Sequence, residues 1–92
     1  MDQNRQIEAI LLLLENEKAQ EASEAFCNIQ PENTTQYFLL KAKIEQKFQN
    51  WGEAINAFNK VLELEPNHTE AQNSLHLIRN ILNFWNPEMF NP

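Results

Sequence analysis

One stretch of the chain, residues 37–66, carries two apolar patterns that both have the period of an α-helix. In its second half, Ala54, Phe58 and Val61 are separated by four and three residues, so they share one helix face. A second stripe occupies the first half and consists of Tyr37, Ile44, Phe48 and Trp51, with the small Ala42 among them. One pair of helices cannot bury both stripes, so the pair must stack on further helices. The pattern therefore predicts an all-α fold built from stacked helix pairs.

An internal repeat extends this organisation toward the N-terminus. Glu21–Phe26 aligns with Glu53–Phe58, and the prolines that follow, Pro31 and Pro66, are separated by close to a 34-residue period. The first copy has three fewer residues between its phenylalanine and its proline. We therefore expect its second helix to be about one turn shorter than that of the second copy.

The helix that opens the first copy is expected over residues 3–16. Its apolar positions are Ile7, Ile10, Leu11, Leu13 and Leu14. A helix that is apolar over most of its circumference touches protein on two sides. Turns are expected near residues 17–18 in the first pair and at Asn50 in the second, because Asn tolerates left-handed backbone geometry.

Four residues of the central stretch, Trp51, Ala54, Phe58 and Pro66, carry a resemblance to a known family. A small residue, an aromatic four residues later and a proline after the helix are similar to the second helix of a tetratricopeptide (TPR) repeat. The resemblance implies one domain over residues 1–92, a right-handed α-solenoid of about two TPR-like helix-turn-helix repeats plus a C-terminal capping helix. The parts are a degenerate first repeat (3–31), a second repeat (34–66), a capping helix (68–84) and an aromatic and proline-rich tail (85–92).

Two segments have the composition of a helix start. In residues 33–36 and 67–70, an Asn at the N-cap position is followed three residues later by Gln or Glu. Asn33 and Asn67 are thus the predicted caps of two new helices. The second of these helices has its main stripe at Ala71, Leu75, Ile78, Leu82 and Trp85, with Leu77 and Ile81 on another side. The tail after it resembles the ending of small bacterial TPR proteins, and we expect it to pack on the body.

Charge and composition favour a protein partner. Seven basic and thirteen acidic residues give a net charge of −6, which argues against nucleic acid, although an acidic surface also serves solubility. The apolar run at residues 9–14 is well short of the about 20 residues that span a membrane. Cys27 is the single cysteine, so no intramolecular disulfide is possible. A cytoplasmic protein without membrane contact is expected.

Residues with catalytic or ligand-binding chemistry are sparse. His68 and His76 are the only histidines, and no cysteine or carboxylate pair stands at zinc-ligand spacing around them. Gly52 is the only glycine, so the chain has no glycine-rich phosphate loop. We expect no enzyme activity, no metal and no cofactor.

The TPR resemblance implies that the first helices of successive repeats line a concave groove. The residues predicted to bind a partner there are Ile7, Leu11, Leu14, Leu39, Leu40, Lys43, Lys47, Leu77 and Ile81. Glu15 and Gln46 share the same helix faces. Chaperone-binding TPR proteins have a carboxylate clamp of Lys, Asn and Arg spread over three repeats. That clamp is absent here, because the matching positions hold Ile7, Leu11, Leu40, Glu70 and Ser74. Lys43 and Lys47, one turn apart, either meet an acidic group of a partner or form a solvated face.

Together, the apolar groove residues would form a larger exposed apolar patch than a soluble monomer usually has. Their expected occupant is a hydrophobic peptide or helix of a partner protein. The alternatives are a second copy in a homodimer, the chain's own tail, or a client of a small TPR chaperone for secreted or assembly proteins. On this hypothesis, Leu40→Glu and Leu77→Glu weaken binding and preserve the helices, whereas Phe58→Ala removes a core side chain.

Overall fold

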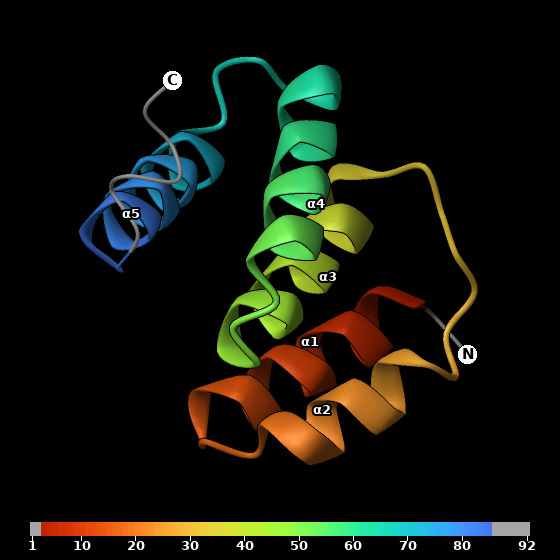
Figure 1. Ribbon diagram of the computed structural model, residues 1–92. Helices are drawn as coiled ribbons and strands as arrows, with labels where there is room; N and C mark the ends of the chain where they lie inside the picture. Colours follow the sequence, from red (N-terminus) through yellow and green to blue (C-terminus); the bar gives the residue numbers. More distant parts are fainter. Residues whose placement is uncertain (1–2, 86–92) are drawn as a thin grey trace.

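The computed structural model describes residues 3–85, and within them every regular element is a helix, which confirms the predicted all-α class. The five helices of this part are α1 (Gln3–Glu15), α2 (Ala19–Phe26), α3 (Thr35–Lys47), α4 (Trp51–Leu64) and α5 (Thr69–Trp85). In Figure 1, α1 and α2 lie at one end and α5 at the other, with α3 and α4 between them. Except for the backbone of Trp85, the predicted tail lies outside the described residues. None of these helices is long and apolar enough to cross a membrane.

The chain forms two helix pairs, α1–α2 and α3–α4. Within each pair, a turn of the same kind joins the two helices. Glu17 and Gln49 both have positive φ, 63° and 60°. The following residue donates its N–H to a carbonyl five positions back: Lys18 to Leu13 at 2.8 Å, and Asn50 to Glu45 at 2.9 Å. This is the hydrogen bond of a Schellman turn, which satisfies a carbonyl at the helix end. The expectation that Asn50 supplies the left-handed residue is wrong by one position, because Asn50 has φ −82°.

Two apolar clusters hold the helices together. The N-terminal core joins α1, α2, the loop after α2 and α3: Ile7, Ile10, Leu14, Ala22, Ile29, Leu40 and Ile44. The C-terminal core joins α3, α4 and α5: Ala42, Ala54, Ala57, Phe58, Val61, Ala71, Leu75 and Ile78. Helix α3 contributes to both, because Leu40 and Ile44 lie on one side and Ala42 on another. It is therefore the helix that links the two ends of the molecule.

The helix starts differ from the predicted ones by one residue. Thr34, with extended backbone angles, caps α3, and its hydroxyl accepts the N–H of Tyr37 at 3.2 Å. Before α5, the imidazole of His68 accepts the N–H of Ala71 at 3.1 Å. The caps expected at Asn33 and Asn67 are therefore corrected to the residues that follow them.

Helix α2 is shorter than the internal repeat predicts. It has 8 residues against 14 in α4, a difference of nearly two turns instead of one. The chain leaves the helix at Cys27 rather than near Pro31 and crosses to α3 as a loop, visible in Figure 1. Ile29 is buried in the N-terminal core. This contact holds the loop against the helices in place of the missing turns.

Candidate functional site

A pocket lies between α1, the turn that follows it, and α3. Its volume is about 390 Å³, and it is open to the surface. The lining side chains are Leu11, Leu14, Glu15, Glu17, Lys43, Gln46 and Lys47. We call this site the α1–α3 pocket.

Helical spacing explains how this pocket is assembled. On α1, Leu11, Leu14 and Glu15 are three and four residues apart and share one face. On α3, Lys43, Gln46 and Lys47 have the same spacing. The two leucines supply an apolar floor, since Leu14 is buried and Leu11 is half-buried. The lysines, Gln46 and the two glutamates supply a rim that combines both charges with one amide.

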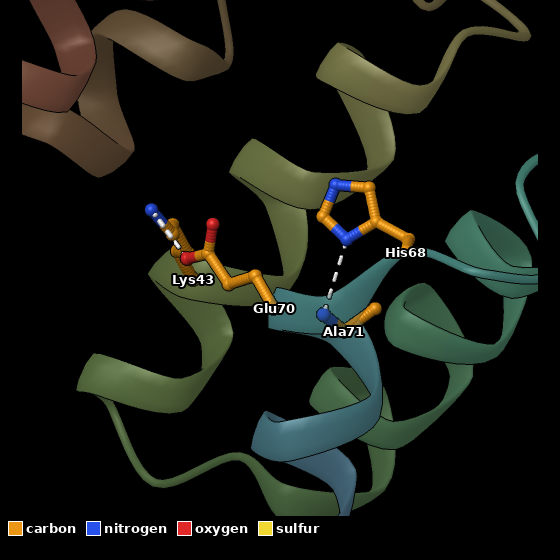
Figure 2. A network of polar contacts seen from close by, with 4 residues as sticks. All are labelled: Lys43, His68, Glu70 and Ala71. Atoms are coloured by element: carbon orange, nitrogen blue, oxygen red, sulfur yellow. Dashed lines mark hydrogen bonds and ion pairs between the residues drawn. The ribbon is translucent and has the colours of Figure 1, made fainter.

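Both lysines of the rim face a carboxylate of the same chain. Lys43 Nζ lies 2.7 Å from an oxygen of Glu70, which joins α3 to the first turn of α5 (Figure 2). Lys47 Nζ lies 3.9 Å from an oxygen of Glu17, whose side chain is largely exposed. Ion pairs at such exposure are worth about 0 to 1 kcal/mol. An acidic group of a partner therefore has to compete with only a weak internal pair at Lys47.

The structure separates the nine residues predicted for the groove. Four of them, Leu11, Leu14, Lys43 and Lys47, line the α1–α3 pocket. The other five do not line it: Ile7, Leu39, Leu40, Leu77 and Ile81.

Burial corrects part of the predicted groove. Ile7, Leu14 and Leu40 belong to the N-terminal core, and Leu40 is only 1% exposed. They are therefore not open surface positions, because α1 and α3 approach each other over these side chains. Leu39 is partly buried against the C-terminal core. On α5, Leu77 remains 51% exposed and Ile81 is half-buried.

One pocket residue, Glu17, escaped the prediction from sequence. It stands in the turn after α1, and its positive φ sets the direction in which its side chain leaves the backbone. A helix-face argument assigns directions only to residues inside a helix. The signal that could have placed Glu17 at the pocket is the turn itself, if it is recognised as a Schellman turn with a non-glycine residue at the left-handed position.

The interior of the described part of the chain is apolar. No buried residue among residues 3–85 is polar or charged. In the same part of the chain, no group of three or more His, Cys, Asp or Glu side chains is placed to hold a metal ion. Cys27 is an exposed free thiol outside the pocket. The α1–α3 pocket itself offers a ligand an apolar floor and a rim of exposed charges.

Comparisons with protein-family models, with curated proteins and with solved structures found no match.

Proposed function

We propose that this chain is a TPR-like helical-repeat module that binds a hydrophobic segment of a partner protein in the α1–α3 pocket, without catalysis. The observation that carries the proposal is the pocket itself, with an apolar floor from α1 and a rim of charged and polar side chains from α1, the turn after it and α3. Sites of this size and mixed lining are typical of places where a side chain of a ligand inserts. The proposed location is the cytoplasm, with neither nucleic acid nor membrane as partner.

The repeat register supports this assignment. Ala22 and Ala54 are both fully buried, and they stand at equivalent positions of the aligned segments. The turn residues Glu17 and Gln49 are as far apart in the chain as Ala22 and Ala54, and both have a positive φ. In a TPR array the first helices of successive repeats line the concave face. The pocket lies between α1 and α3, the two helices that hold this position in the proposed repeats.

The lining indicates the chemistry of the segment that fits. An aliphatic or aromatic side chain would rest on Leu11 and Leu14. A carboxylate beside it would reach Lys47, whose internal partner is 3.9 Å away and exposed. A polyanionic backbone is disfavoured, because Glu15 and Glu17 stand on the same rim and the chain carries net charge −6.

The test uses two substitutions on neighbouring residues of α1. Leu11→Glu places a carboxylate on the pocket floor, whereas Leu12→Glu places the same group at a position that is 58% exposed and outside the pocket. Wild type and both variants are used to capture proteins from native lysate, and the helical circular-dichroism signal checks that each is folded. A partner that Leu11→Glu loses and Leu12→Glu retains would support the proposal.

Equal capture by the two variants would contradict it, because the pocket would then play no part in binding. Lys47→Ala provides a second test of the pocket and should not disturb the fold, since the Lys47 side chain is exposed. It should weaken the same partner, with a larger effect at low salt, because exposed charges are screened by ions.

A further inference from the structure

A second apolar surface lies on α5, apart from the α1–α3 pocket. Leu77, Ile81 and Phe84 are four and three residues apart, so they line one side of the helix. Leu77 is 51% and Phe84 is 83% exposed, and Ile81 is half-buried. The side that packs on α4 carries other residues of the C-terminal core, among them Leu75 and Ile78. We call the exposed set the α5 stripe.

The surroundings of the α5 stripe differ from the rest of the surface. After Glu70, the helix contains one charged residue, Arg79, in a chain that otherwise has many acidic residues. The exposed neighbours of Leu77 on the same side are Asn73 and Asn80, four residues before it and three after it. Depletion of charge around an apolar centre is characteristic of the buried part of protein interfaces.

These features favour one occupant, a second copy of the same chain. In a two-fold interface the same surface of each copy meets that of the other, so a rim of one charge sign would repel itself. An amide carries both donors and an acceptor, so an asparagine rim is complementary to itself. Two chains of net charge −6 repel each other over most approaches, whereas α5, with one acidic and one basic residue, adds no net charge to this repulsion.

We propose that two copies of this chain associate through their α5 stripes, with the helices antiparallel about a two-fold axis. The proposal is independent of the partner-binding function, because no stripe residue lines the α1–α3 pocket. A 17-residue helix is about 25 Å long, so the contact is small and the dimer is expected to be weak.

The first measurement is the mass in solution as a function of concentration. Sedimentation equilibrium of the wild type, from about 10 µM to 1 mM, should show the average mass rise from 10.8 kDa toward twice that value. Leu77→Glu places two like charges in the interface and should raise the dimer Kd about tenfold or more. Leu12→Glu adds the same charge at an exposed position on α1 and should leave the dimer Kd unchanged.

Amide NMR shifts recorded over the same concentrations locate the contact. They should change with concentration at Leu77 and Ile81 and stay constant at Leu11 and Lys47. A mass of 10.8 kDa at every concentration would overturn the proposal, and the stripe would then be covered by another part of the chain or by a different protein. A dimer that Leu77→Glu does not weaken would overturn it as well. Neither result affects the partner-binding proposal, which depends on Leu11→Glu.

Discussion

The imidazole of His68 accepts a hydrogen bond from the backbone N–H of Ala71, with 3.1 Å between Nδ1 and N (Figure 2). This contact caps α5, since the first N–H groups of a helix have no partner within the helix. Thr34 does the same for α3 through its hydroxyl and the N–H of Tyr37. The two caps use different acceptors, a hydroxyl oxygen and an imidazole nitrogen, and in each the N–H that donates belongs to the residue three positions later.

The first prediction concerns the cap of α5. His68→Ala removes the Nδ1 acceptor and leaves the N–H of Ala71 without its cap partner. The expected loss is about 0.5 to 2 kcal/mol in urea unfolding, the usual worth of an N-cap.

His68→Asn is the matched control, because its amide oxygen can accept the same N–H. This variant should retain most of the wild-type stability. If it loses as much stability as His68→Ala, the hydrogen bond to Ala71 does not contribute to the stability of α5.

Much of the fold follows from the apolar stripes, and the details that failed depend on single backbone angles. The stripe of Ala54, Phe58 and Val61 predicts α4 and its buried face, and all three residues are buried in the C-terminal core. The caps were misplaced by one residue because Asn33 and Thr34 are consecutive polar residues that both have a cap-forming side chain. Only the extended backbone of Thr34 selects between them.

For a related reason, only part of the candidate site could be predicted from the sequence. Leu39 and Leu40 are adjacent leucines, and the sequence does not state which of them faces α1. The observed α1–α3 contact buries Leu40 and leaves Leu39 against the other core. Lys43 and Lys47 both line the α1–α3 pocket, as expected of two residues one helical turn apart. Their ion pairs with Glu70 and Glu17 depend on how helices far apart in the chain are arranged.

The second prediction concerns the C-terminal core. Phe58 is 0% exposed and packs among residues of α3, α4 and α5. Phe58→Ala should lower the free energy of unfolding by about 3 to 5 kcal/mol, because it leaves a cavity between three helices. Phe58→Leu retains most of the volume and should cost clearly less. Chemical denaturation of both variants measures the difference, and equal small losses would mean that this core is loosely packed.

The third prediction compares two leucines that were first grouped together. Leu40 is 1% exposed in the N-terminal core, so Leu40→Glu buries a carboxylate without a partner and should abolish the cooperative unfolding transition. Leu77 is 51% exposed, so Leu77→Glu should retain the wild-type helical signal and melting temperature within a few degrees. Circular dichroism with heating tests both. A folded Leu40→Glu variant would show that α1 and α2 do not cover this side of α3.

The fourth prediction concerns the turn between α3 and α4. Gln49 has φ 60°, a conformation that costs an L-residue about 1 to 2 kcal/mol and that glycine adopts freely. Gln49→Gly should raise the unfolding free energy by about 0.5 to 1 kcal/mol, after the larger unfolded-state entropy of glycine is included. Gln46→Gly, inside α3, should lower it by about 1 kcal/mol. If both changes destabilise equally, the left-handed turn at residue 49 is not formed in solution.

The fifth prediction concerns Tyr37, the only tyrosine of the chain. Its ring lies against Phe26 and Phe38, with centroid distances of 5.1 and 5.3 Å. Partial burial, and to a smaller extent the negative charge of the Cys27 thiolate, raises the pKa of Tyr37 above its ordinary value of 10.0. The folded state then holds the proton more tightly than the unfolded state, so this contribution to stability is complete below pH 10.0 and is lost as pH rises through the folded pKa.

Ultraviolet titration of the tyrosinate band measures this pKa directly, because no other tyrosine contributes. Cys27→Ser removes the thiolate and should bring the pKa of Tyr37 part of the way back toward 10.0, with the effect of burial remaining. A complete return to 10.0 would mean that the thiolate charge, and not the packing of α2 against α3, controls the phenol. A wild-type value at or below 10.0 would mean that the Tyr37 hydroxyl is fully hydrated in solution.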